Sequence, residues 1–190
     1  MSNSRSDNSV TGPDIPNPTA SESPTSSPRL NTRLEAEGAE FLVLGNLLIE
    51  GITCYKAYVN FRGYDLLALN PEQSRIARIQ VKSRWATDYD RSFSIKNFDC
   101  DFVVHVALNR GYRFGKVPKE GDRGIKEPLY YVFPTQVVRA AQNVGDKWGK
   151  VTISNIADVE HYRSNWNLIA DYLGVQMRSK ALAGMDGMPE

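Results

Sequence analysis

The run DFVVHVALN, residues 101–109, is the feature that most constrains how this chain can fold. Its apolar side chains are continuous rather than alternating, which is typical of a strand buried on both faces in the middle of a sheet. Only a fold with other elements on each side of a sheet provides such a place. The sequence therefore predicts a layered fold with a central sheet.

Length and composition limit the remaining possibilities. The 190 residues, 41% apolar and 24% charged, fit one globular domain. A net charge of +1 means that any affinity for nucleic acid would depend on a local patch. No apolar run approaches the ~20 residues of a membrane span, and no secretory signal is evident. Two cysteines, Cys54 and Cys100, are too few for a disulfide framework or a zinc site, so we expect reduced core thiols in a cytoplasmic protein.

Composition also divides the chain. Residues 1–30 are rich in Ser, Asn, Thr and Pro, and such a segment buries too little apolar surface to offset its ordering entropy, so disorder is expected there. The folded domain is expected over residues 31–174, followed by a flexible tail over 175–190.

The first helix is expected to begin at Asn31 or Thr32 and to end before Gly51. Its apolar positions form two stripes, which indicates packing on more than one side. Glu37 and Glu40 interrupt these stripes. Buried carboxylates are costly unless they are paired or coordinate a ligand, so both residues are candidates for a site.

The rest of the chain indicates a mixed α/β fold with a central sheet flanked by helices. A short helix is expected at 135–142 with Thr135 as its cap, and a long basic loop at 110–128. A last helix is expected from Asp158 to Leu173, with one apolar face that includes Tyr162 and Trp166. The further expected strands are ITCYKAYVNF (52–61), YDLLAL (64–69), RIARIQVKS (75–83), LYYVFP (129–134) and KVTI (150–153).

Three polar residues stand out on two of these strands. The turn NPEQ makes a hairpin, which brings Asp65 near Gln80 and Lys82, and these last two share one face of their strand. Asp65, the Gln80 amide and the Val81 carbonyl are oxygen donors of the kind that Mg²⁺ prefers. Lys82 can neutralise a phosphate or orient a water. The pattern therefore indicates hydrolysis of a phosphodiester.

The residues GAEFLVLGNLLIEG, GYDLLAL and IQVKS together resemble the PD-(D/E)xK nuclease superfamily, which has the restriction-endonuclease-like fold. The resemblance is to the branch whose motif ends in Gln-x-Lys. It implies an αβββαβ core, cleavage of DNA with Mg²⁺ (or Mn²⁺ in its place), and a homodimer. By that resemblance Glu40 matches the helix glutamate, Asp65 the motif aspartate, Gln80 the usual carboxylate position and Lys82 the motif lysine.

Several alternatives stay open. Gln80 removes a charge from the metal site, so the chain can also be a catalytically inactive module of this fold that binds DNA or a protein. Asp65 and Lys82 can form a plain surface ion pair. Glu40 can pair with Lys56 or an arginine instead of a metal. A third, weaker alternative is that the substrate is RNA instead of DNA, which no residue of the sequence decides.

The basic residues near the motif suggest contacts to phosphate. Salt-dependent DNA binding is expected from them as a group, although for any one of them alone a solvated surface is the better interpretation. His105 is expected to be a satisfied core histidine, and His161 a solvated one. No Ser-His-Asp or Cys-His arrangement and no glycine-rich phosphate loop is present, so no nucleotide cofactor is expected. The proposed phosphate-contacting residues are Arg75, Arg78, Arg84 and Lys96.

Overall fold

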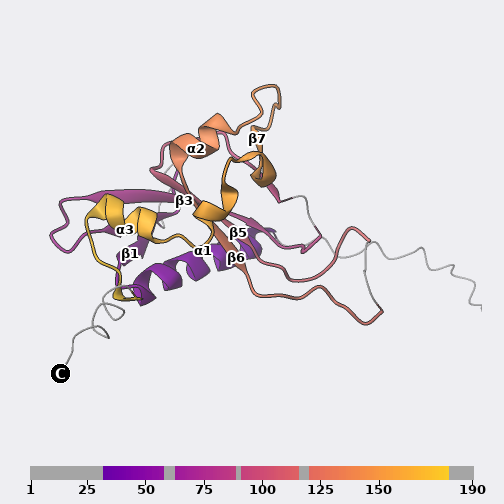
Figure 1. The fold of residues 1–190 in the computed structure, drawn as a ribbon, viewed down its shortest axis with the longest axis horizontal. Coiled ribbons are helices and arrows are strands. Elements are labelled where there is room, and N and C mark those ends of the chain that lie inside the picture. The colour runs from indigo at the N-terminus through magenta and orange to yellow at the C-terminus, as the bar shows by residue number, and fades with distance from the viewer. Residues whose placement is uncertain (1–31, 58–62, 89–90, 116–119, 180–190) are drawn as a thin grey trace, which may run out of the picture. The chain divides into compact units, whose positions relative to one another are not determined.

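The computed structural model describes residues 32–57, 63–88, 91–115 and 120–179. The predicted disorder of residues 1–30 lies outside these ranges. The fold has a five-stranded sheet in the order β1-β2-β3-β5-β6 and a two-stranded sheet of β4 and β7 (Figure 1). The strands are β1 (Thr53–Lys56), β2 (Leu66–Leu69), β3 (Ile76–Arg84), β4 (Ser92–Ser94), β5 (Phe102–Ala107), β6 (Leu129–Pro134) and β7 (Lys150–Thr152). The helices are α1 (Thr32–Ile49), α2 (Thr135–Ala140) and α3 (Asn167–Leu173), with 3₁₀ turns at Ile153–Asn155 and Val159–Tyr162.

The main sheet is mixed. β1, β2 and β3 are antiparallel neighbours, β5 runs parallel to β3, and β6 returns antiparallel to β5. All six residues of β5 are buried, so the prediction of a central strand covered on both faces is confirmed. The crossover from β3 to β5 contains the short strand β4 instead of a helix, and β4 pairs with the distant β7.

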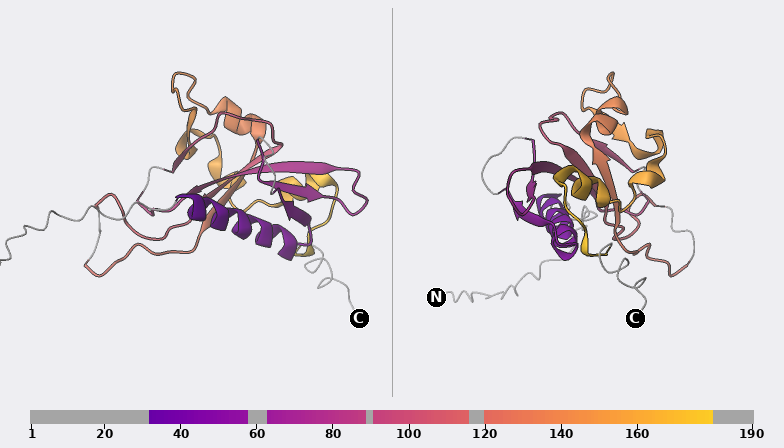
Figure 2. Two further views of the ribbon diagram at one scale, coloured as in Figure 1. Left: turned by 180° about the vertical axis from the view of Figure 1, so that it is seen from behind. Right: turned by 60° about the vertical axis from the view of Figure 1, so that its left-hand side comes forward.

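The two faces of the sheet are covered by different elements. Figures 1 and 2 show α1 along one face, with α2 and β7 on the opposite side. One apolar cluster joins α1 and α3 to alternate residues of β2, β3 and β5, and a second joins α2, β4 and β7 to β5 and β6. This arrangement confirms the predicted mixed α/β class with a helix-flanked central sheet.

Helix α1 has nearly the predicted bounds and ends before Gly51, which has a φ of +86°. Its buried residues form a single stripe, Ala39, Val43 and Leu47. The side chains at Leu34, Phe41 and Leu48 are 68%, 49% and 47% exposed. The prediction that the helix packs on more than one side is therefore wrong within the described residues, because the sheet contacts only one of its faces.

The predicted helix from Asp158 to Leu173 is two elements. A 3₁₀ turn covers Val159–Tyr162, the chain turns at Ser164 with a φ of +47°, and α3 follows. Ser164 donates its backbone N–H to the carbonyl of Tyr130 on β6, which fixes the break. The expected common face is consequently divided: Tyr162 packs in the cluster under α2, and Trp166 in the cluster under α1.

Two further predictions are corrected at the ends of elements. Thr135 is the first residue of α2 and not its cap, because the N-cap position is held by Pro134; the Thr135 hydroxyl lies 3.3 Å from the Cys100 sulfur in a buried contact. Residues 175–179, expected to begin a flexible tail, lie against the end of α1. There Arg178 donates its N–H to the Glu50 carbonyl, and Met177 is 5% exposed. Residues 180–190 lie outside the described ranges.

Within the described ranges no helix combines the length and apolar character that crossing a bilayer requires. The cellular compartment stays a prediction. Both cysteines are free and buried, as expected.

Candidate active site

Asp65 is fixed where β2 begins, beside β3. Its backbone N–H donates to the Ile79 carbonyl at 2.8 Å, and its carbonyl accepts from the Ala57 N–H at 2.9 Å. Its carboxylate accepts a third bond, from the backbone N–H of Val81 at 2.7 Å. The hairpin thus brings Asp65 to the middle of β3, as the turn at NPEQ predicted.

Gln80 and Lys82 lie on the face of β3 that is turned away from α1. Their partners on β5 are Val103 and His105. The Oε1 atom of Gln80 is buried and has no hydrogen-bond partner in the described part of the chain. An orphaned buried acceptor costs about 1–3 kcal/mol of stability, so a group that supplied a positive charge there would be stabilising.

The Val81 backbone completes the set of oxygen donors. Its N–H binds the Asp65 carboxylate, and in an antiparallel pair the N–H and C=O of one residue point toward the same neighbour. The Val81 carbonyl therefore faces the Asp65 side of β3.

These donors fit a hard divalent cation that keeps most of its water. One carboxylate, one amide oxygen and one backbone carbonyl match the few oxygen ligands that Mg²⁺ takes from proteins. Among the described residues, no three or more His, Cys, Asp or Glu side chains are grouped so that they could hold a metal ion. These three donors carry only one negative charge, that of the carboxylate. They therefore suit a divalent cation that is also bound by a phosphate of the substrate.

Lys82 is a partly buried lysine close to these oxygens. Burial lowers its pKa from the ordinary lysine value, Arg84 acts in the same direction, and the negative charges of Asp65 and Glu40 oppose the shift. Because the net direction is downward, Lys82 releases its proton more readily than an exposed lysine. It can serve as a cation for phosphate or, once neutral, accept a proton.

Glu40 is engaged in an ion pair with Lys56, the alternative that the sequence left open. Lys56 also lies 2.7 Å from Glu37, and its side chain is 6% exposed. Burial raises the pKa of Glu40, the hydrogen bond from Lys56 opposes this rise, and the charge of Asp65 adds to it. Glu40 is thus electrostatically coupled to Asp65 while it is held by Lys56.

His105 is a residue whose importance the sequence did not indicate. It is fully buried beside Lys82 in the β3–β5 register and packs against the Phe93 ring at 5.2 Å. Neither ring nitrogen has a hydrogen-bond partner among the described residues, so the prediction of a satisfied core histidine is wrong. Burial, with Arg84 and Arg91 adding to it, lowers the pKa of His105 to about 3. The polar residue inside the run DFVVHVALN was the available signal.

The predicted phosphate-contacting residues do not form one patch. Arg78 pairs with Asp99 and Asp101, and Arg84 donates to the Ser92 carbonyl at 2.7 Å. Lys96 lies over the Trp148 ring at 4.8 Å. Arg75 precedes the opposite end of β3, which at about 3.3 Å per residue lies roughly 23 Å from Lys82. Of these residues, only Arg84 lies near Lys82.

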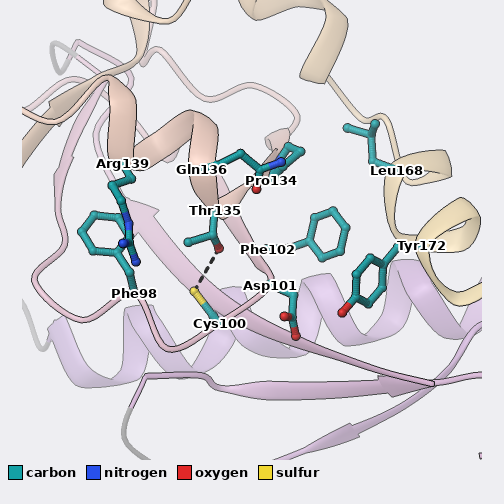
Figure 3. Close-up of a pocket in the computed structure, with 10 residues that line it drawn as sticks. All are labelled: Phe98, Cys100, Asp101, Phe102, Pro134, Thr135, Gln136, Arg139, Leu168 and Tyr172. Carbon is teal, nitrogen blue, oxygen red and sulfur yellow. Dashed lines mark hydrogen bonds between the residues drawn. The ribbon is translucent and has the colours of Figure 1, made fainter. Parts of the chain in front are cut away.

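A separate pocket of about 620 Å³ lies between α2 and α3 (Figure 3). Cys100 and Thr135 meet in its wall, and Arg139 lies over the Phe98 ring at 5.0 Å. Burial raises the pKa of Cys100, so its thiol stays protonated. This pocket contains no activated nucleophile.

No protein-family model matches the chain, and no curated protein sequence does. Among solved structures, a bacterial homing endonuclease, I-Ssp6803I, is 21% identical with a TM-score of 0.47, over 83% of this chain and 100% of its own. Hjc, a Holliday junction resolvase from Archaeoglobus fulgidus, is 17% identical with a TM-score of 0.41, over 74% and 97%. Both are named as enzymes that act on DNA substrates, a homing endonuclease and a junction resolvase. At these TM-scores neither likeness assigns a substrate or a catalytic residue to this chain.

Proposed function

We propose that this protein is a metal-dependent nuclease that hydrolyses phosphodiester bonds in DNA. The observation that carries the proposal is the orphaned Gln80 oxygen, buried on the strand that also presents Lys82 and whose Val81 amide binds Asp65. A buried acceptor without a partner lowers stability, and so does the partial burial of the neighbouring lysine, so their presence side by side supports a binding role for this face.

In this proposal Asp65, Gln80 and the Val81 carbonyl hold Mg²⁺, for which Mn²⁺ substitutes. The bound cation would acidify a water and offset the phosphate charge. Lys82 donates to a phosphate oxygen and stabilises the charge that develops there. Its lowered pKa also allows the neutral amine to orient or deprotonate the attacking water. Glu40, held by Lys56, contributes negative potential that favours the cation.

A second candidate is a catalytically silent module that binds DNA or a protein partner. The specific observation in its favour is the same glutamine: with Gln80 neutral and Glu40 paired to Lys56, Asp65 is the single carboxylate that the proposal assigns to the cation. Metal affinity distinguishes the two candidates. The homodimer implied by the sequence resemblance stays a prediction, which light scattering after size exclusion would check.

The test is cleavage of supercoiled plasmid and of single-stranded, forked and duplex DNA in Mg²⁺, Mn²⁺ or EDTA. Asp65→Ala and Lys82→Ala are compared with the exposed controls Asp171→Ala and Lys126→Ala. The proposal predicts metal-dependent nicking that both site variants lose and both controls retain. Cleavage that survives both site substitutions would refute it, and salt-dependent binding without cleavage by any form would favour the silent module.

A further inference from the structure

A second feature of the site is a pocket that Lys82 helps to line. Its volume is about 590 Å³, within the range of small-molecule sites. The first turn of α1, the end of β3 and the segment around Phe114 form its walls. The pocket is therefore continuous with the proposed catalytic lysine but extends past it.

The lining combines aromatic rings with positive charge. The rings belong to Trp85, Phe93 and Phe114, of which Phe93 is 1% exposed. Three cations also line the pocket: Lys82, Arg84 and Arg113. Glu35 is the acid in the wall, and its carboxylate accepts from the Ser83 hydroxyl at 3.3 Å. Aromatic faces with interleaved arginines are the means by which proteins bind single-stranded nucleic acid.

The backbone of the loop that carries Phe114 is held in place by hydrogen bonds with residues 87 and 88. The Asp88 carboxylate accepts the backbone N–H groups of Arg113 at 3.0 Å and of Phe114 at 2.7 Å. Thr87 fixes the same loop: its hydroxyl donates to the Gly124 carbonyl, and its backbone N–H donates to the Gly111 carbonyl. Phe114 is nevertheless 60% exposed. A large aromatic side chain is thus presented to solvent by a fixed backbone.

We propose that this pocket binds an unpaired nucleotide next to the scissile phosphate, so that the substrate class is DNA with single-stranded or displaced bases. The inference rests on the proposed nuclease function. The base lies against the aromatic rings, and its phosphate lies toward Arg113. Glu35 disfavours a second phosphate inside the pocket but accepts a hydrogen bond from an exocyclic amino group. A base that uses both its face and its edge in this way must have left the duplex stack.

The experiment measures binding in EDTA, where cleavage is absent, with an oligonucleotide that carries 2-aminopurine. Single-stranded, forked and fully duplex forms of one sequence are compared. Phe114→Ala is expected to lower affinity for the unpaired forms about tenfold, since stacking on one aromatic ring supports an effect of that size. Phe114→Trp should restore it. Ile125→Ala, 46% exposed in the same loop, is the matched control and should bind like the unaltered protein.

The outcomes separate this inference from the proposed function. Binding of unpaired DNA that depends on Phe114, with no cleavage by any form, would leave the pocket assignment standing and refute the nuclease. Cleavage that depends on Asp65, with Phe114→Ala unchanged on every DNA form, would overturn the pocket assignment alone. An equal loss on unpaired and duplex DNA would also overturn it, since Phe114 would then be a general DNA contact.

Discussion

On the α1 side of β3, Ala77 and Ile79 are fully buried among apolar side chains. On the opposite side, Gln80 and Lys82 are packed against a region where His105 also lacks a partner. The two faces are one residue apart along the same strand, yet one stabilises the fold and the other lowers its stability. Polar groups that reduce stability are expected where a site requires them.

The largest expected effect is a loss of cleavage when Lys82, on the polar face of β3, is replaced. Lys82→Met keeps most of the side-chain volume and removes the charge. Cleavage is expected to fall about 10²–10³-fold, as when one stabilising donor is removed from an active site. The free energy of unfolding should not fall, because the lowered pKa of Lys82 means that its charge is disfavoured in the folded state. Plasmid nicking measures the cleavage rate, and urea denaturation measures the free energy of unfolding. A large loss of stability in Lys82→Met would contradict the view that this face of β3 does not stabilise the fold.

The opposite face should respond in the opposite way. Ile79→Ala removes a fully buried side chain and is expected to lower the free energy of unfolding by about 2–5 kcal/mol. The cleavage rate per folded molecule should be nearly unchanged, since Asp65 bonds to the backbone of residue 79 and not to its side chain. The denaturant midpoint of Ile79→Ala tests the expected loss of stability. The cleavage rate, measured at denaturant concentrations below that midpoint, tests whether the site is unchanged. Loss of cleavage with intact stability would mean that the faces are not separable.

Acid should destabilise the protein through His105. Its folded pKa, about 3, lies below the ordinary value of about 6.5, so the unfolded chain takes up a proton first as pH falls. The contribution of neutral His105 is present above pH ~6.5 and is lost toward pH ~3, by up to about 1.4 kcal/mol per pH unit. His105→Leu should flatten that dependence in thermal melts.

Replacement of Gln80 should give the smallest change in the free energy of unfolding. Gln80→Leu removes the orphaned acceptor, so the free energy of unfolding is expected to rise by about 1 kcal/mol. Mn²⁺ affinity, measured by titration calorimetry, should fall at the same time. Gln80→Glu should raise that affinity by adding a charged oxygen donor. A drop in stability for Gln80→Leu would show that its oxygen has a partner in solution.

Local patterns predicted much of this fold and part of its site. The bounds of α1, the β2–β3 hairpin and the burial of β5 follow from periodicity and turn residues, which act over a few positions. The same hairpin placed Asp65 correctly, because a tight turn fixes the pairing of its strands.

The errors came from contacts between distant segments. The apolar face from Val159 to Leu173 fits a helix by itself, and only the bond from Ser164 to the Tyr130 carbonyl reveals why the chain breaks there. The anchoring of residues 113–114 by Asp88 joins residues about 25 positions apart. No pattern local to either segment contains that information.

The bonds between Arg78 and Asp101 also hold the register of β3 against β5. Arg78 lies at the start of β3, and both its backbone N–H and its guanidinium bind Asp101, just before β5. Because side chains alternate along a strand, a slip of one residue between β3 and β5 would turn Gln80 and Lys82 toward α1. Such a misaligned chain would keep its helices and strands and give an ordinary circular dichroism spectrum. A chain misaligned in this way would lack the proposed site and still pass that test, so the specific activity of the proposed nuclease should be referred to titrated sites and not to protein mass.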